Sequence, residues 1–271
     1  MKNADNQKEM SFLGHLEELR WHILRSLIAI VLVAIVAFIF KDIVFDSVLF
    51  GPRQPDFISN KLFCKVADLL KSDDLCINQT NFQIINIQMS GQFSMHVKLS
   101  FIAGFIIAFP YIFFEFWRFL SPALHTNERK YAAGAVFWSS FLFLSGVAFG
   151  YFVITPLTVH FFNGYFVSNQ VLNQINLISY TSTFSSVILS SGVIFELPVL
   201  IFFLSKTGLI TASFLKKYRK HAFVLVLTLA AIITPPDVFS QILVSLPLVF
   251  LYEVGILLAK RIERKQLKAI K

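Results

Sequence analysis

The chain has 271 residues, of which 56% are hydrophobic and 15% are charged, and its mean hydropathy is +0.67. Charged residues make up about a quarter of an average soluble domain, so this composition excludes an ordinary soluble protein. A transmembrane β-barrel is also excluded, because it needs alternating apolar and polar residues over strands of about ten residues, whereas the apolar runs here are continuous. The composition predicts an all-α polytopic membrane protein, in which the 32 phenylalanines suit a lipid-facing surface and interfacial aromatic belts.

Six apolar segments are predicted to cross the membrane, within a single domain that covers residues 1–271. In chain order they are residues 22–40, 97–119, 131–154, 181–205, 222–234 and 239–258. The first is too long for the apolar region of a cleavable signal peptide, so we interpret it as an uncleaved span. Residues 155–180 contain Thr-Pro and Asn-Gly pairs and are predicted to be a loop with an interfacial helix.

The last two predicted spans are short, since a crossing needs about 20 apolar residues to cover about 30 Å of hydrocarbon. Only a polar, proline-paired segment from Thr234 to Gln241 separates them. Helices this short, joined by so tight a turn, imply a locally thin bilayer or protein that dips below the membrane surface. Three prolines within the predicted spans, Pro110, Pro198 and Pro247, are expected to bend their helices. The bundle is therefore predicted to be cupped, like a glove.

Positive charge gathers in the N-terminal region, in residues 118–130, in residues 206–220 and in a basic tail at 259–271. Together these segments hold 18 of the 24 Lys and Arg residues. Because positively charged loops stay in the cytoplasm, both termini are predicted to lie inside, and the long segment 41–96 is predicted to be a periplasmic loop. Topology thus explains the net charge of +8, and its division among four segments argues against nucleic-acid binding.

The two cysteines of the chain, Cys64 and Cys76, lie in the loop at 41–96, and the interval between them is typical of a short helix. Outside the cytoplasm, an oxidising compartment permits a disulfide between them. The alternative is two free thiols packed as small hydrophobes. A metal site is not expected, because two lone cysteines supply too few ligands.

Glu196 lies near the middle of the fourth predicted span. A charged side chain at the bilayer centre costs about 3 kcal/mol or more, so Glu196 is expected to face protein or a water-filled cavity, or to be protonated. It is either part of a polar site in the concave face or a structural glutamate hydrogen-bonded to a neighbouring helix. Glu115 and Glu253 lie nearer the cytoplasmic ends of their spans and are interpreted as structural, with Arg118 as a helix-surface partner for Glu115.

Acidic residues on the otherwise basic face form another unusual feature. Residues 12–20 are an amphipathic segment before the first span that carries Glu18 and Arg20, and Glu128 lies in the loop after the second span. A carboxylate in a polybasic setting can bind a cationic ligand, preferably arginine, whose fork pairs bidentately with it. The alternative is a helix cap at Glu128 or its salt bridge to Arg129, and spacing alone favours this alternative.

Enzyme motifs are missing from the sequence: it has no Gly-rich phosphate loop, no Gly-x-Ser-x-Gly and no His-Glu-x-x-His. We therefore expect neither catalysis nor a cofactor, and a membrane-embedded enzyme is a poor rival interpretation. The other rival is a proton-coupled small-molecule transporter that uses Glu196. It predicts inverted repeats and broken helices around the midplane, and the sequence has no convincing internal repeat.

Four segments together resemble the TatC family, the multi-spanning receptor subunits of the twin-arginine (Sec-independent) protein translocase. They are HLEELR at 15–20, FLSPAL through ER at 119–129, FELP at 195–198 and TPPDVFSQ at 234–241. The resemblance runs along nearly the whole chain. It implies a non-enzymatic receptor that binds twin-arginine signal peptides of folded precursors at its cytoplasmic face. It further implies TatA and TatB-type single-span partners, a homo-oligomer in the bilayer of the bacterial inner membrane, and transport driven by the proton-motive force.

The resemblance also implies roles for individual residues. Glu18 and Glu128 resemble the carboxylates that receive the two signal arginines, and Arg20 and Phe119 resemble their neighbours in the same site. Glu196 resembles the polar residue inside the family's concave face.

Further positions resemble the family's partner contacts and structural residues. Thr234 and Gln241 resemble the polar positions that contact TatA and TatB. Pro52 resembles the proline at the start of the first periplasmic loop, and the loop itself is longer than expected for the family. The residues of the short turn that are interpreted as structural are Pro235, Pro236 and Asp237.

Overall fold

The computed structural model describes residues 12–70, 76–78, 82–120, 132–168, 170–171, 173–234 and 238–270. Its α-helices are α1 (Phe12–Ile39), α2 (Ile58–Leu70), α3 (Gly91–Leu120), α5 (Ala132–Phe149), α6 (Thr155–Gly164), α7 (Leu177–Phe195), α8 (Leu197–Lys206), α9 (Ala212–Lys217), α10 (Arg219–Ile233) and α11 (Val238–Ile270). Short π- or 3₁₀-helical segments are η1 (Ile43–Leu49), η2 (Gly51–Arg53) and η5 (Gly150–Ile154). The strands β1 (Ile84–Ile85) and β2 (Ile175–Asn176) pair in parallel.

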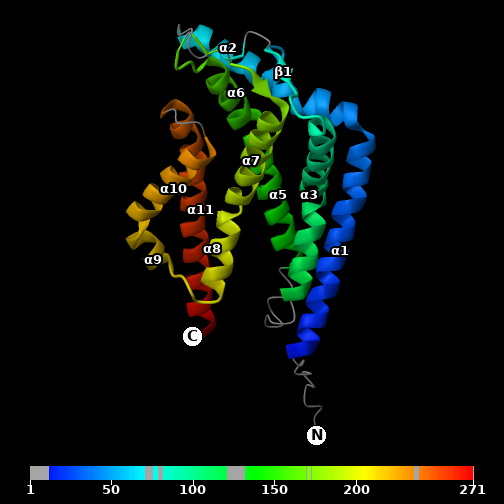
Figure 1. Ribbon diagram of the computed structural model, residues 1–271. Helices are drawn as coiled ribbons and strands as arrows, with labels where there is room; N and C mark the ends of the chain where they lie inside the picture. The colour runs from blue at the N-terminus through cyan, green and yellow to red at the C-terminus, as the bar shows by residue number, and fades with distance from the viewer. Residues whose placement is uncertain are drawn as a thin grey trace.

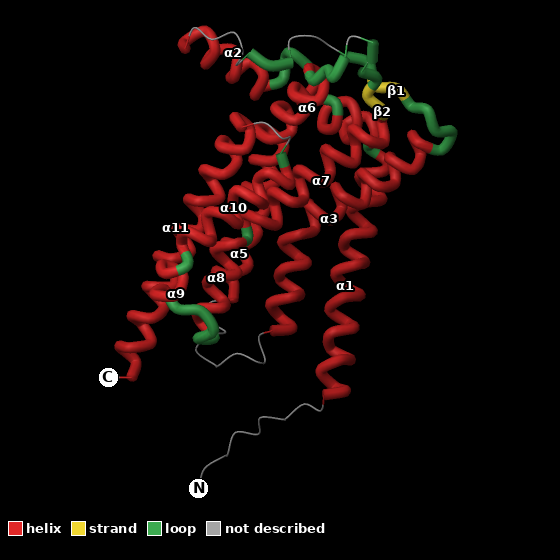
Figure 2. The backbone as a smooth tube through the Cα atoms, turned by 60° about the vertical axis from the view of Figure 1, so that its left-hand side comes forward, coloured by secondary structure: helices red, strands yellow, loops and turns green. Residues whose placement is uncertain are grey.

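The long helices stand side by side, and the start of α1 and the end of α11 lie at the same end of the bundle (Figure 1). We call this the terminal end. The opposite end carries α2, β1, β2 and α6 and is called the cap end (Figure 2). The helix α10 packs against α11 to form a hairpin beside α7.

Five helical stretches of the described chain are long and apolar enough to cross a membrane. They are Leu16–Ile39, Gly91–Phe119, Gly134–Gly164, Leu177–Lys206 and Ser240–Lys265. Each overlaps a predicted span, which confirms the all-α polytopic membrane fold. The remaining predicted span, 222–234, lies in α10, whose 15 residues cover only about 22 Å. This helix is therefore shorter than a full crossing of the hydrocarbon.

The last helix differs from the prediction that both final helices are short. α11 has 33 residues, because it continues from the apolar segment 239–258 into the basic segment predicted as a tail at 259–271. Lys, Arg, Glu, Gln and Leu all favour helix, and no Gly or Pro interrupts this part of the sequence. The prediction of a short helix thus holds for α10 and is wrong for α11.

Proline has different effects in different helices. Glu196 separates α7 from α8, and Pro198 lies in the first turn of α8, where its missing N–H breaks no hydrogen bond. Pro110 and Pro247 lie inside α3 and α11, and both helices continue through them. Of the three positions where bends were predicted, only the one at Pro198 coincides with a break between two helices.

The segment 155–164 does not form the separate interfacial helix that was predicted. α6 continues α5 through the π-helical turn η5, and Pro156 is tolerated because it lies in the first turn of α6. α7 then begins at Leu177, where the Asn176 side chain caps it by accepting a 3.0 Å hydrogen bond from the backbone N–H of Ile178.

Glycine allows two pairs of helices to approach closely. A Cβ added at Gly104 of α3 would lie 2.7 Å from the carbonyl oxygen of Ile30 in α1, and one at Gly146 of α5 would lie 2.6 Å from that of Ser191 in α7. Both distances are shorter than a van der Waals contact. Small residues at such contacts are how helices associate in lipid, where the hydrophobic effect does not drive them together.

A disulfide and a polar network hold the cap end together. Cys64 of α2 is bonded to Cys76, two residues before Asn78, whose φ of 53° lies in the left-handed region that Asn tolerates. The Asn78 side-chain amide donates to the carbonyl oxygen of Pro156 at 3.0 Å and, at 3.4 Å, to that of Pro52. The predicted periplasmic loop is therefore fastened to the start of α6.

Candidate functional site

Three of the four residues predicted to bind a signal peptide lie at the terminal end of α1 and α3, which run side by side (Figure 1). Glu18 is partly buried near the start of α1 and has no ion-pair partner among the described residues. Arg20 is exposed, and its Nη1 lies 3.5 Å from Oε1 of Glu17. Phe119 is partly buried at the end of α3. Glu128 lies outside the described residues.

A buried carboxylate joins the two helices below this surface. Glu115 of α3 accepts a 2.5 Å hydrogen bond from Nδ1 of His22 in α1, and Nη1 of Arg25 lies 3.8 Å from the same oxygen. The predicted helix-surface pair with Arg118 is not the contact observed, because the α1 side chains approach Glu115 more closely. The His22 ring also lies edge-on to Phe119, with 6.1 Å between the ring centroids. Glu115 thus orients a ring that packs against the candidate signal-binding surface.

The charge pattern of this surface separates two neighbouring glutamates. The exposed pair between Glu17 and Arg20 is expected to contribute at most about 1 kcal/mol. Glu18 is one residue further on, more buried and unpaired within the described chain. A carboxylate in that situation is available to an incoming guanidinium, whereas Glu17 already has a cationic partner.

Glu196 lies at the break between α7 and α8 and interacts with a neighbouring helix. The Ser139 hydroxyl of α5 donates to the Glu196 carboxylate, 2.9 Å from each of its oxygens. Ser139 is completely buried, whereas Glu196 is partly exposed. This geometry satisfies one lone pair of the carboxylate and leaves capacity for further donors, so it is compatible with both interpretations made from the sequence.

The polar positions beside the short turn lie on the α10–α11 hairpin. The Thr234 hydroxyl is buried and donates to the carbonyl oxygen of Ala230 at 2.8 Å, which caps the end of α10. Nε2 of Gln241 in α11 donates to the carbonyl oxygen of Leu227 in α10 at 3.2 Å. Residues 235–237, with both prolines and the aspartate of the turn, lie outside the described residues. Gln241 therefore links α11 to α10, whereas Thr234 bonds within its own helix.

Pro52 is buried in η2 at the cap end, at the opposite end of the bundle from Glu18, Arg20 and Phe119. Its carbonyl oxygen accepts a 3.0 Å hydrogen bond from the side-chain amide of Asn60. Within the described ranges, no group of three His, Cys, Asp or Glu side chains lies close enough to hold a metal ion.

Several residues that contact the site were not predicted from the sequence. His22 and Ser139 carry no motif, and their partners, Glu115 and Glu196, are 93 and 57 residues away. Asn60 and Asn78 are single amides in a loop that has no periodic pattern. The sequence did indicate that the two glutamates have polar partners, because an intramembrane carboxylate requires one. It does not say which helix supplies the partner.

Comparison with known proteins identifies the family. The model of the family described as Sec-independent protein translocase protein (TatC) matches residues 14–247. The TatC of Blattabacterium sp. subsp. Periplaneta americana is 43% identical over 98% of this chain and 100% of its own length, and that of Desulforapulum autotrophicum is 34% identical over 96% and 88%.

The chain belongs to the TatC family. Two solved structures titled as the twin arginine translocase receptor TatC agree in fold, with TM-scores of 0.68 and 0.63 at 30% identity. They cover 90% and 92% of this chain and 99% of their own. The chain is thus a multi-pass membrane protein of a protein-translocase family, and the rival interpretation, a small-molecule transporter, has no support among these relatives.

Proposed function

We propose that the chain is the receptor subunit of a twin-arginine protein translocase, which binds the signal peptides of folded precursors and with single-span partners moves them across the bacterial inner membrane. The observation that carries the proposal is the family match over residues 14–247. The partly buried, unpaired Glu18 within the described chain supports it, because the site offers a carboxylate on a face that is otherwise basic.

Recognition would begin at the terminal end. One signal arginine pairs with Glu18, and the other pairs with Glu128 by the resemblance to the family. A guanidinium forks onto a carboxylate through two parallel hydrogen bonds, so Lys-Lys is a poor substitute for Arg-Arg. The aromatic face of Phe119 offers a cation–π contact beside them. The signal then inserts along the concave face, past the polar pair of Glu196 and Ser139.

Movement of the precursor requires the partner subunits. TatA and TatB-type proteins would contact the α10–α11 hairpin beside Thr234 and Gln241. The short α10 supports this, because a helix of about 22 Å leaves the bilayer thin at this position. Both termini lie in the cytoplasm in this proposal, and the proton-motive force supplies the energy.

Export of a folded reporter tests the proposal. The reporter carries a twin-arginine signal in cells that lack their own TatC and express this chain with its native small partners. We expect export that depends on the chain and disappears when Arg-Arg becomes Lys-Lys. Export that is absent although the chain is inserted and its partners are expressed would overturn the proposed function.

A further inference from the structure

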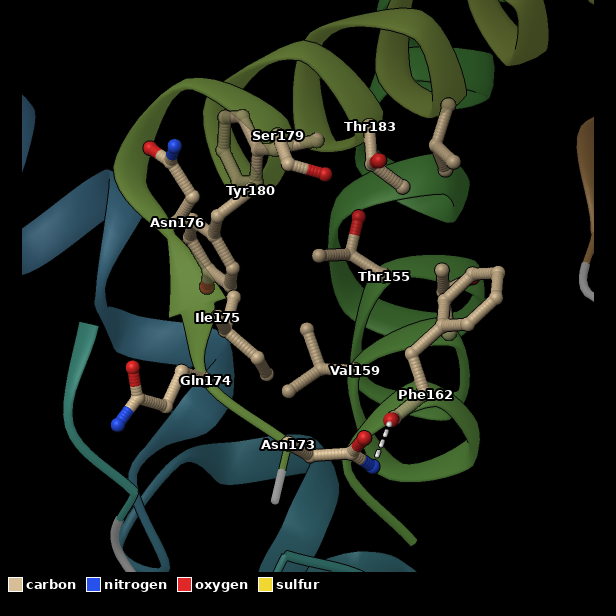
Figure 3. Close-up of a pocket in the computed structure, with 13 residues that line it drawn as sticks. Thr155, Val159, Phe162, Asn173, Gln174, Ile175, Asn176, Ser179, Tyr180 and Thr183 are labelled. Atoms are coloured by element: carbon tan, nitrogen blue, oxygen red, sulfur yellow. Dashed lines mark hydrogen bonds between the residues drawn. The ribbon is translucent and has the colours of Figure 1, made fainter. Parts of the chain in front are cut away.

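A pocket of about 320 Å³ lies at the cap end between α6, β2 and α7. Thr155 and Val159 of α6 face Ile175 and Tyr180 across the hollow (Figure 3). None of the described residues that line it is charged. Its volume is near the lower limit of about 300 Å³ for ligand pockets, so it suits a short peptide segment or a small molecule and no folded domain.

Several polar groups that line this pocket are already hydrogen-bonded within the protein. The Tyr180 hydroxyl donates to the carbonyl oxygen of Leu49 at 2.9 Å, and that of Thr155 donates to Gly150 at 2.8 Å. The Asn173 amide donates to the carbonyl oxygen of Tyr165 at 2.9 Å. These contacts fix the walls of the pocket and are not available to a ligand.

Other hydrogen-bonding groups have no partner among the described residues. Thr158 is 3% exposed, and its buried hydroxyl lacks any hydrogen bond within the described chain. Leaving such a group unpaired costs about 1–3 kcal/mol. A helical threonine populates two χ1 rotamers, so rotation can move this hydroxyl to another staggered position. Gln174, Ser179 and Thr183 also line the pocket with no hydrogen bond from their side chains in the described chain.

The strand at the edge of the pocket offers backbone groups as well. β2 pairs with β1 along one edge, and in the described chain the sheet contains only these two strands. Backbone N–H and C=O groups of alternate residues point to opposite edges of a strand, so one of the two residues of β2 directs its N–H and C=O away from β1. An extended peptide binds such an edge by adding a strand.

We infer that this pocket binds the distal end of the inserted signal peptide as an extended, uncharged segment with small side chains. The inference rests on the proposed function. A signal peptide has a charged start, an apolar region of about 7–15 residues and an end of small residues. If its arginines bind at the terminal end, the small residues are the part that is directed toward the cap end.

The short apolar region of a signal peptide favours an extended conformation for the residues at its distal end. An apolar region of 15 residues covers only about 22 Å as a helix, less than the hydrocarbon thickness of about 30 Å. The residues that follow the apolar region cover about 3.3 Å each when they are extended. Small side chains fit the limited volume, and the hydroxyl and amide groups of the pocket pair with the exposed peptide backbone.

Photo-crosslinking tests the inference in the full chain with its native partners. A benzophenone amino acid is introduced singly at Thr183 in the pocket, at Phe119 at the terminal end, and at Ser186, which is exposed on the same helix as Thr183. We expect adducts with a twin-arginine precursor at positions 119 and 183 and none at 186. A precursor whose small distal residues are replaced by tryptophan should lose the adduct at 183 and retain that at 119.

The outcomes separate this inference from the proposed function. An adduct at 119 with none at 183, an equal yield at 183 and 186, or an adduct at 183 that persists with the tryptophan precursor overturns the pocket assignment alone. Absence of adducts at both 119 and 183 overturns the proposed function and the pocket assignment with it. As a second measurement, Thr183→Trp fills the pocket and should lower export about tenfold, whereas Ser186→Trp should leave it unchanged. Equal export by both variants contradicts the inference.

Discussion

Glu17 and Glu18 are adjacent in sequence and carry the same charge, but their surroundings differ. Glu17 is exposed beside Arg20, whereas Glu18 is partly buried and has no ion-pair partner in the described chain. A ligand arginine that binds Glu17 must displace Arg20, and one that binds Glu18 displaces no cation of the described residues. A substitution of Glu17 is therefore a matched control for the same substitution of Glu18.

Replacing Glu18 should weaken signal binding selectively. A hydrogen bond to a charged group contributes about 1.5–3 kcal/mol, so Glu18→Gln is expected to reduce affinity roughly 10- to 100-fold. Glu17→Gln should change it less than threefold. The measurement is the Kd of a twin-arginine signal peptide for each purified variant at fixed ionic strength. Equal affinities for the two variants would remove Glu18 from the site.

Glu196 should affect a different step. Because it lies at the α7–α8 break and contacts Ser139, Glu196→Ala is expected to lower export at least tenfold while signal affinity stays within a factor of two. Ser139→Ala removes the single described donor to this carboxylate and should reduce export by a smaller factor. The assay compares export and signal binding for the same two variants. Full export by the Glu196 variant would return this residue to a structural role.

At the scale of helices, the close contact between α5 and α7 depends on Gly146, which has no side chain. Gly146→Ala would place a Cβ 2.6 Å from the backbone oxygen of Ser191, and backbone cannot rotate away as a flexible side chain can. We expect a loss of about 1–3 kcal/mol from overpacking. Gly134→Ala, on the same helix, meets nothing within 4 Å and should be neutral or slightly stabilising. Thermal unfolding in detergent compares the two, and equal Tm values would contradict the close contact.

The sequence predicted the existence of the helices better than their ends. Continuous apolar runs identify spans because hydrocarbon leaves the backbone no other partners. The ends depend on other factors: α11 continues past its apolar segment because its basic residues also favour helix, and α6 continues from α5 because Pro156 occupies a permitted first-turn position. Neither boundary is marked by a change in hydropathy alone.

The candidate site was predictable only in part, for a related reason. Glu18 stands out in sequence as a carboxylate on a basic face, and Glu196 stands out as a carboxylate within an apolar span. Their neighbours His22 and Ser139 do not, because a histidine or serine in an apolar segment has many possible partners. Contacts across 93 and 57 residues are set by helix packing. Side chains that support a site therefore require the tertiary structure, whereas charges at the site can be found without it.

For the whole molecule, the two ends of the bundle differ in chemistry. The described residues of the basic segments lie at the terminal end, whereas the cap end carries the Cys64–Cys76 disulfide and the uncharged pocket. A disulfide persists in an oxidising compartment, and positively charged segments stay in the cytoplasm. Both physical arguments support the proposed orientation, in which the cap end lies outside the cytoplasm.

Cysteine labelling in spheroplasts tests this orientation. Met89 is fully exposed before α3 at the cap end, and Leu209 is 75% exposed between α8 and α9 at the terminal end. We expect a membrane-impermeant maleimide to label Met89→Cys in intact spheroplasts and Leu209→Cys only after the membrane is permeabilised. The parent chain is the control: its two cysteines are bonded to each other, so it should stay unlabelled without a reductant. Labelling of Leu209→Cys but not Met89→Cys before permeabilisation would invert the topology and place Glu18 on the wrong side of the membrane for a cytoplasmic signal receptor.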